Sequence, residues 1–365
     1  MPVISEIEFA ARYTRAKMIC ITGSNGKTTT TSLLFDILQR AGLDVGLAGN
    51  IGNSLALQVA QHDRAYYVIE LSSFQLDNMY DFRADIAILM NITPDHLDRY
   101  DHCFQNYVDA KMRITRNQTA NDALIYWAED PVIDSEIRKL HPQATLYPFG
   151  EKNGHNVAYI DGDTFVLAAT QAAQPLQMPV TELSLKGRHN QYNSMAAGVA
   201  AQLLHIHNEV IRQSLTLFAG VSHRMQYVTT VRDIRFINDS KATNVNSCWY
   251  ALECMTTPTV LILGGTDKGN DYREIDALVR KKCHTLVFMG LNNEPLREHF
   301  TGMCREDGTP LLIIDTDNLD GAVRGAFEAA HPGDTVLLSP CCASFDLFRN
   351  YEDRGDKFMQ AVRQL

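Results

Sequence analysis

The chain has 365 residues, of which 45% are hydrophobic and 21% charged, as in a globular protein of about two domains. Its formal net charge of −10 argues against a broad nucleic-acid or anionic-membrane surface, because both partners are negatively charged. Its cysteines form no C-x-x-C pair and no apolar run is as long as a membrane span, so we expect a cytoplasmic protein with neither a nucleic-acid partner nor a membrane span.

The first part of the chain predicts a parallel sheet. Residues 17–23 (KMICITG) predict a buried strand, and a glycine-containing turn leads from it into a helical pattern, TTTSLLFDILQRAG. Residues 65–74 and 84–93 are further β-branched and aromatic runs that end on polar residues. Ligands collect at the carboxyl ends of such strands, so Glu70 and residues 91–98 are candidates for a site.

The rest of the chain predicts a change of architecture. Residues 145–185 show short alternations with a turn signal at 161–163 (DGD), which predicts a small antiparallel section before a helix in KGRHNQYNSMAAGVAAQLL. Strand-like runs (RFIND, TVLILGG, HTLVFMG, PLLIID, DTVLLSP) then alternate with helical patterns. We therefore expect two α/β domains, 1–221 and 222–365, with the boundary close to FAGVSHR.

The turn after the first strand has the chemistry of a phosphate loop. Glycines let backbone N–H groups turn inward, the helix N-terminus adds positive dipole, a lysine adds charge, and a threonine hydroxyl can contact Mg²⁺. The usual signature G-x-x-x-x-G-K-[ST] would need glycine where this chain has Ile21. The candidate phosphate ligands are Gly23, Ser24, Asn25, Gly26, Lys27 and Thr28.

Glu70 and His96 follow strands of the same predicted sheet as this loop. A carboxylate and an imidazole delivered to that edge could hold a divalent metal beside the phosphates. Taken alone, His96 is more typical of a hydrogen-bonded loop residue. Lys111, in FQNYVDAKMRIT, has helical spacing that favours a solvated lysine.

Three polar loops follow strands of the second predicted domain: residues 237–244 (INDSKATN), 264–269 (GGTDKG) and 339–346 (SPCCASFD). Any one of them would be weak evidence, since polar loops between strand and helix are common. Together at one sheet edge they predict a second anionic ligand, held by Lys268 and the Ser344 hydroxyl, whereas ordinary capping residues are the alternative.

These motifs together resemble the Mur ligases, ATP-dependent amide-forming enzymes of peptidoglycan precursor synthesis, whose phosphate loop has the shortened form TGSNGKT. The resemblance extends along the chain through the following stretches: ELSSFQL at 70–76, NITPDHLDRY at 91–100, GRHNQYN at 187–193, HR at 223–224, NDSKATN at 238–244 and SPCCASFD at 339–346. The last two are most similar to members that add D-glutamate to UDP-N-acetylmuramoyl-L-alanine (UDP-MurNAc-L-alanine).

The resemblance implies a fold and a set of roles. It implies a central P-loop-type ATPase domain, with a mostly parallel sheet and a small antiparallel section, followed by a Rossmann-like α/β domain that binds the amino acid. Besides the loop, the nucleotide contacts would be Asn50, Asn190, Asn193, His223, Arg224, Asp239 and Lys241. The D-glutamate contacts would be Thr243, Lys268, Ser344, Phe345 and Tyr351.

The resemblance also implies two magnesium ions, held by Thr28, Glu70, His96 and Lys111. Lys111 matches a lysine that the family N6-carboxylates to a carbamate, which would convert a cation into a metal-binding anion. Lys27, Glu70, His96 and Lys111 are thus the expected catalytic residues of an ADP-forming acid–amino-acid ligase. The expected enzyme is a monomer that phosphorylates the UDP-MurNAc-L-alanine carboxylate to an acyl phosphate, which the amine of D-glutamate then attacks.

Two departures from the family pattern stand out. Trp127 occupies a position where the family usually has asparagine. Family members also carry an N-terminal UDP-binding domain, whereas here only PVISEIEFAARYTRA precedes the first strand. We therefore expect a truncated chain that binds ATP but has reduced affinity for the UDP substrate and reduced turnover.

Three alternatives remain open from the sequence. The phosphate loop alone would fit a small-molecule kinase or NTPase equally well. A folylpolyglutamate-type ligase would share the loop and metal site, although NDSKATN and SPCCASFD argue against it. The third alternative is a nucleotide-binding module without turnover.

Overall fold

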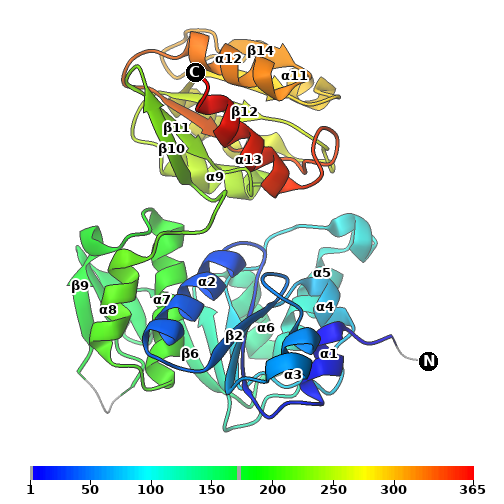
Figure 1. Cartoon of the computed structure of the whole chain (residues 1–365), viewed down its shortest axis with the longest axis vertical. Helices are drawn as coiled ribbons and strands as arrows, with labels where there is room; N and C mark the ends of the chain where they lie inside the picture. The colour runs from blue at the N-terminus through cyan, green and yellow to red at the C-terminus, as the bar shows by residue number, and fades with distance from the viewer. Residues whose placement is uncertain (1–2, 171–173) are drawn as a thin grey trace. The chain divides into compact units, whose positions relative to one another are not determined.

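The computed structural model describes residues 3–170 and 174–365 (Figure 1). The chain divides into two compact units, Met1–Gly220 and Val221–Leu365, and this division falls within the stretch FAGVSHR. Within the described residues, no helix is both long enough and apolar enough to cross a membrane.

The first unit is built on one sheet whose described strands run in the order β2-β3-β1-β4-β5-β6-β7-β8-β9. The strands are β1 (Lys17–Thr22), β2 (Val45–Gly49), β3 (Tyr66–Glu70), β4 (Ile86–Leu89), β5 (Ala123–Trp127), β6 (Thr145–Glu151), β7 (Ala158–Asp161), β8 (Thr164–Leu167) and β9 (Leu176–Pro179). The helices are α1 (Glu6–Ala11), α2 (Lys27–Arg40), α3 (Leu55–His62), α4 (Ser73–Asp77), α5 (Phe104–Met112), α6 (Pro131–Leu140), α7 (Arg188–Leu203) and α8 (Asn208–Leu217), with 3-10 helices η1 (Leu97–Tyr100), η2 (Arg113–Thr115) and η3 (Val180–Glu182).

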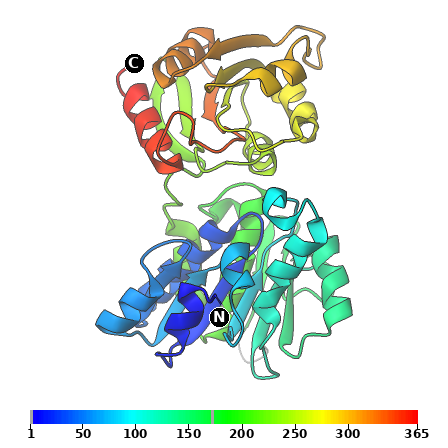
Figure 2. The ribbon, with the colours of Figure 1, turned by 90° about the vertical axis from the view of Figure 1, so that its right-hand side faces the viewer.

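Alternation along the central strand divides the core of this unit into two layers. Ile19 and Ile21 of β1 pack on the face covered by α2, α7 and α8, whereas Met18 and Cys20 pack on the face covered by α1 and α3 to α6 (Figures 1 and 2). A central strand buried on both faces is typical of parallel α/β sheets.

The mostly parallel sheet and its small antiparallel section are confirmed, with one correction. Residues 145–151 form β6, which pairs in parallel with β5 because helix α6 crosses between them. The antiparallel section begins only with the β7–β8 pair, whose turn carries Gly162 at a φ of 59°. The predicted turn signal is thus confirmed, but the first strand of the stretch belongs to the parallel part of the sheet.

The second unit is a doubly wound sheet with the described order β10-β11-β15-β12-β13-β14. Its strands are β10 (Gln226–Val231), β11 (Ile234–Asn238), β12 (Thr259–Leu263), β13 (Cys283–Met289), β14 (Leu312–Thr316) and β15 (Thr335–Leu338). Its helices are α9 (Val245–Glu253), α10 (Asp276–Lys282), α11 (Glu294–Phe300), α12 (Leu319–Ala329) and α13 (Tyr351–Val362), with the 3-10 helix η4 (Tyr272–Ile275). Helices α9 to α11 cover one face and α12 and α13 the other. Only the β10–β11 pair is antiparallel among these strands, so the polar loops after β11, β12 and β15 share one edge.

Candidate functional site

The phosphate loop connects β1 to α2 in a shape that requires glycine twice. Gly23 has a φ of 148°, and a Cβ there would lie 2.9 Å from the Met90 Cβ. Gly26 is the N-cap of α2 with a φ of 83°, in the left-handed region. The loop therefore directs the N-terminus of a 14-residue helix toward the site.

The end of β4 holds the loop from the side. The side-chain amide of Asn91 accepts the Asn25 N–H at 2.8 Å and donates to the Asn25 carbonyl at 3.0 Å. The Ser24 hydroxyl donates to the Thr93 carbonyl at 2.8 Å and lies 3.0 Å from the Tyr107 hydroxyl of α5. These contacts fix the loop backbone in a single shape.

Two lysines converge on one carbonyl of the loop. The Lys27 Nζ donates to the Gly23 carbonyl at 2.8 Å, and the Lys111 Nζ donates to the same oxygen at 2.7 Å. Lys111 is only 2% exposed, so the expectation of a solvated lysine from helical spacing is wrong. Burial, reinforced by the charge of Lys27, lowers the pKa of Lys111 well below its usual value, although Asp95 and Glu70 oppose the shift.

Glu70 ends β3 as a buried carboxylate with one oxygen in use. Its Oε1 accepts the side-chain N–H of Asn50 at 3.0 Å, while its Oε2 has no hydrogen-bond partner among the described residues. A buried carboxylate oxygen without a donor fits a hard cation such as Mg²⁺. Thr28 lies in the first turn of α2, the helix that follows the neighbouring strand β1, and it is 7% exposed. Its hydroxyl is a further oxygen ligand for such a cation.

His96 lies at the start of η1 and is less buried than Glu70. Its backbone has a φ of 52°, its ring packs against Phe74 with centroids 5.1 Å apart, and its Nε2 lies 3.7 Å from Asp95 Oδ2. Glu70 and His96 do not belong to a cluster of three or more ligand residues; among the described residues such a cluster occurs only in the second unit. Asp95 lies in the predicted stretch 91–98, but the sequence predicts no role for it alone; its charge acts on both Lys111 and Tyr107.

Helix α7 brings two predicted asparagines to the phosphate loop. A Cβ at Gly26 would lie 2.4 Å from the Asn193 Oδ1, and that oxygen accepts the Thr30 hydroxyl at 3.2 Å. Asn193 in turn donates to Asn190 Oδ1 at 3.0 Å. Both side chains are buried, so α7 lines the loop from the face opposite α5.

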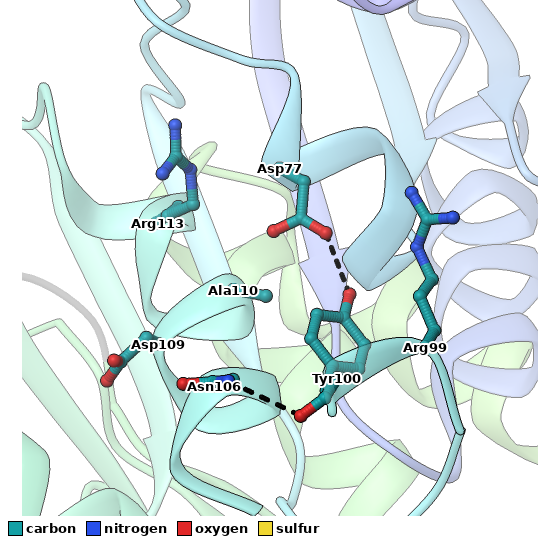
Figure 3. A pocket seen from close by; sticks show the side chains of 7 residues that line it. All are labelled: Asp77, Arg99, Tyr100, Asn106, Asp109, Ala110 and Arg113. Carbon is teal, nitrogen blue, oxygen red and sulfur yellow. Dashed lines mark hydrogen bonds between the residues drawn. The ribbon is translucent and has the colours of Figure 1, made fainter. Parts of the chain in front are cut away.

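A polar cavity of about 400 Å³ lies between α4, η1 and α5 (Figure 3). Its charged groups are engaged within the protein. Asp77 accepts the Tyr100 hydroxyl at 2.9 Å, the Arg99 guanidinium lies 4.4 Å from the Phe74 ring centroid, and Arg113 donates to backbone carbonyls of α4 and of the segment after it. We interpret the cavity as part of the packing that positions η1, which His96 directly precedes, and α5, which carries Lys111.

In the second unit, the loops after β12 and β15 are joined by an isolated antiparallel β-bridge. Thr266 and Ala343 exchange backbone hydrogen bonds of 2.9 and 3.2 Å, and a Cβ at Gly265 would lie 2.2 Å from the Ala343 carbonyl oxygen. This pairing joins the two loops that carry the predicted amino-acid ligands Lys268, Ser344 and Phe345. Lys268 is exposed, Ser344 is buried and Phe345 is 70% exposed.

The loop after β11 carries the remaining predicted residues of this unit. Lys241 donates to the Tyr351 hydroxyl at 2.7 Å, the Lys241 backbone donates to the His223 carbonyl at 3.0 Å, and the Thr243 N–H donates to the Lys241 carbonyl at 3.0 Å. Asp239 is fully buried and accepts the Ser339 hydroxyl at 3.0 Å. Burial raises the pKa of Asp239 to about 6, against the opposing charge of Arg224.

Arg354 of α13 ties these loops together, and sequence reasoning missed it. Its guanidinium is 1% exposed and donates to the Ser240 hydroxyl at 3.0 Å and carbonyl at 2.9 Å, to the Cys342 carbonyl at 3.1 Å and to the Gly264 carbonyl at 3.5 Å. Burial lowers the pKa of Arg354 to about 10. The planar fork of an arginine suits contact with several loops at once.

Trp127, the departure from the family pattern, ends β5. Its ring packs against Tyr192 of α7 with centroids 5.1 Å apart, and its indole N–H is buried without a hydrogen-bond partner among the described residues. The tryptophan therefore contributes packing between sheet and helix in place of the amide contacts that an asparagine would make.

Comparisons with known proteins agree with this geometry. Residues 21–201 match the model of the Mur ligase middle domain, and residues 223–342 match that of the Mur ligase glutamate ligase domain. The UDP-N-acetylmuramoylalanine–D-glutamate ligase of Bacteroides fragilis is 61% identical over 365 residues, covering 100% of this chain and 80% of the relative. The enzyme of the same name from Porphyromonas gingivalis is 54% identical with the same coverage.

Solved structures show the same fold at lower identity. The MurF ligase of Thermotoga maritima, in complex with ADP, has a TM-score of 0.71 and 14% identity, covering 98% of this chain and 82% of that one. A pseudomurein peptide ligase type C from Methanothermus fervidus has a TM-score of 0.71 and 20% identity, covering 98% and 81%. With both domain models matched and 61% identity along its whole length to a named member, the chain belongs to the Mur ligase family.

Proposed function

We propose that this chain catalyses the ATP-dependent joining of D-glutamate to UDP-MurNAc-L-alanine, an ADP-forming step of peptidoglycan precursor synthesis. The observation that carries the proposal is the 61% identity, over all 365 residues, to a relative named for this reaction. In this proposal residues 1–221 form the ATP-binding domain and residues 222–365 the domain that binds the amino acid.

The phosphate loop is the ATP site of this proposal. The backbone N–H groups at the N-terminus of α2 and the Lys27 ammonium supply the local positive potential that a triphosphate needs, since the chain as a whole carries a net charge of −10. The N–H groups of Ser24 and Asn25 already donate to Asn91, so in this proposal these two residues shape the loop. Asn50, Asn190 and Asn193 contribute from the first unit. For the second unit, the nucleotide contacts in this proposal are His223, Arg224, Asp239 and Lys241, and they rest on the resemblance to the family alone.

Magnesium fits the oxygen ligands beside the loop. Thr28 and the unpartnered oxygen of Glu70 would hold one ion, and His96 together with a carbamate on Lys111 would hold a second. When bound, the ions supply charge neutralisation at the phosphoryl oxygens. The proposal places both ions at the carboxyl edge of the sheet, where β1, β3 and β4 end.

The environment of Lys111 supports its N6-carboxylation. Burial lowers the pKa of Lys111 and so favours the neutral amine, which is the form that reacts with CO₂. The amine lone pair forms an N–C bond as one C=O π pair of CO₂ moves onto oxygen, and the nitrogen then releases one proton. The product is an anion, so it attracts the Lys27 ammonium, which shares the Gly23 carbonyl with Lys111.

The D-glutamate site of the proposal lies on the second unit. Lys268 supplies a cation for a carboxylate, Ser344 and Thr243 supply hydroxyls, and Phe345 and Tyr351 supply apolar walls. The pairing of Thr266 with Ala343 holds the loops of Lys268 and Ser344 side by side.

The reaction follows from these parts in two transfers. A carboxylate oxygen of UDP-MurNAc-L-alanine attacks the γ-phosphorus of ATP, the bond to the β-phosphate oxygen breaks, and ADP leaves. The amine of D-glutamate then attacks the acyl carbon, the amine loses a proton, and phosphate leaves with the electrons of the C–O bond. Lys27 and the loop amides stabilise the negative charge that accumulates in the first transfer.

The test measures ADP formation with ATP and UDP-MurNAc-L-alanine in the presence of D-glutamate, L-glutamate or no amino acid. We expect ADP formation to require the UDP substrate and to be fastest with D-glutamate. Equal rates with L-glutamate, or ADP formation that needs neither substrate, would overturn the proposal in favour of another ligase or an NTPase. The variant Lys268→Ala serves as an internal check, since it should raise the KM for D-glutamate without changing that for ATP.

A further inference from the structure

A cluster of two imidazoles and one carboxylate lies in the second unit, at the edge of the sheet opposite to the edge used by the proposed ligase reaction. His284 is the second residue of β13, His331 follows α12, and Asp334 immediately precedes β15. Parallel strands β13 and β15 both begin here, so the cluster marks the amino edge of the sheet, whereas Lys268 and Ser344 follow the carboxyl ends of strands. We propose that His284, His331 and Asp334 form a binding site for a Zn²⁺-class transition-metal ion.

The spacing of the three ligand atoms fits such an ion. His284 Nε2 lies 3.0 Å and His331 Nδ1 3.5 Å from the same carboxylate oxygen, Asp334 Oδ2, and all three atoms lie within 4.8 Å of one another. Ligands about 2.1 Å from a tetrahedral ion stand about 3.4 Å apart. Metal entry therefore needs only small side-chain rotations.

The backbone around Asp334 holds its carboxylate in place before any ion arrives. Asp334 Oδ2 accepts the His331 N–H at 2.7 Å, and the Asp334 N–H donates to the His331 carbonyl at 3.0 Å. The Asp334 carbonyl also accepts the Arg235 N–H at 2.9 Å, which ties this turn to β11. Two ligands thus belong to one rigid turn, and a rigid turn lowers the entropic cost of assembling the site.

His284 has the outer partner that metal-bound imidazoles normally have. Its Nδ1 lies 2.9 Å from the hydroxyl of Thr285, which is 1% exposed. With Nδ1–H donating to that hydroxyl, the lone pair of Nε2 is available to the ion. Without metal, Nε2–H donates to Asp334 instead, so binding exchanges one tautomer for the other.

The ligand set selects the class of metal. Two neutral imidazoles and one carboxylate suit Zn²⁺, Co²⁺ or Ni²⁺, whereas Mg²⁺ prefers a ligand set made up mainly of oxygen atoms. The His331 side chain is 80% exposed, so water can complete the coordination. The bound ion would cross-link β13 to the turn that leads into β15, stabilising the second unit.

The experiment titrates Zn²⁺ into the full chain, without a histidine tag and in excess Mg²⁺, by calorimetry. We expect a single high-affinity ion per chain and a rise in unfolding temperature with Zn²⁺. His331→Ala changes an exposed side chain and should weaken binding by more than about 100-fold, and His284→Gln should do the same. Both variants should lose the thermal shift.

The control is His299→Ala. His299 Nε2 contacts Asp276 Oδ1 at 2.7 Å, the same imidazole–carboxylate pairing without a second imidazole, so this variant should bind Zn²⁺ like the parent. Substituting Co²⁺ should give the intense visible absorption of a four-coordinate ion in the parent and in His299→Ala only. Absence of binding, or equal affinity in the parent and His331→Ala, would overturn the proposal without bearing on the ligase reaction.

Discussion

Two glycines flank helix α2 with similar backbone conformations but different surroundings. Gly26 precedes the helix with a φ of 83° and Gly42 follows it with a φ of 78°. A Cβ at Gly26 would lie 2.4 Å from Asn193 Oδ1, whereas a Cβ at Gly42 would meet nothing within 4 Å. The pair therefore separates the cost of the left-handed backbone from the cost of crowding the phosphate loop.

Gly42→Ala should cost only the left-handed backbone, about 1–2 kcal/mol, and leave the KM for ATP unchanged. Gly26→Ala should cost about 1–3 kcal/mol more because of overpacking. At about 2–4 °C per kcal/mol for a unit of this size, Gly26→Ala should unfold several degrees lower in a thermal scan. Displacement of even one loop amide from the triphosphate, at about 1.5–3 kcal/mol, should raise the KM for ATP by about 10- to 150-fold. Equal Tm and equal KM in the two variants would refute the assignment of Gly26 to the nucleotide site.

Further predictions concern buried charged groups. Burial raises the pKa of Asp239 to about 6, above the ~3.9 of an unfolded chain, so between these values the folded state binds a proton more tightly than the unfolded state. The free energy of unfolding should therefore fall as the pH rises from about 4 to about 6. In urea unfolding, the difference in the free energy of unfolding between pH 4 and pH 7 should be smaller by about 3 kcal/mol in Asp239→Asn than in the parent. The same pH dependence in both proteins would contradict this prediction. Glu70→Gln should raise the Mg²⁺ concentration for half-maximal ADP formation by at least about 10-fold, and an unchanged Mg²⁺ titration would argue against a Glu70 ligand. Arg354→Met should lower the free energy of unfolding of the second unit by at least about 3 kcal/mol, because it removes the hydrogen bonds to the loop carbonyls. Arg354→Lys should be similarly unstable, since an ammonium lacks the planar fork of a guanidinium. A decrease below about 1 kcal/mol in urea unfolding would show that the loops do not depend on Arg354.

The elements that sequence predicts well here are those whose signal is local. β1 and α2 carry a buried apolar run, a glycine turn and helical spacing in immediate succession, and the structure places them at Lys17–Thr22 and Lys27–Arg40. The sequence misassigned β6 to the antiparallel section because a short alternation cannot distinguish a strand of a parallel sheet from a strand of an antiparallel hairpin. Its parallel pairing depends on the crossover through α6, a non-local feature.

The residues that sequence misjudged or missed are cations buried by tertiary packing. Lys111 and Arg354 both lie on helices, and they are 2% and 1% exposed. The helical spacing of Lys111 favours a solvated side chain, whereas the sequence predicts nothing for Arg354. Only the resemblance to a family pointed to Lys111, and nothing pointed to Arg354. A buried cation can be recognised from sequence only when the carbonyls that accept its hydrogen bonds are known, and here the carbonyls of Gly23 and Ser240 belong to loops distant along the chain.

The clamp of Asn91 on Asn25 has a kinetic consequence. Since both backbone groups of Asn25 are already hydrogen-bonded, the phosphate loop does not have to become ordered when ATP arrives. Less conformational entropy is then lost on binding, so nucleotide association should follow a single diffusive step without a slow rearrangement of the loop. Any lag in turnover would then originate in movements outside the phosphate loop.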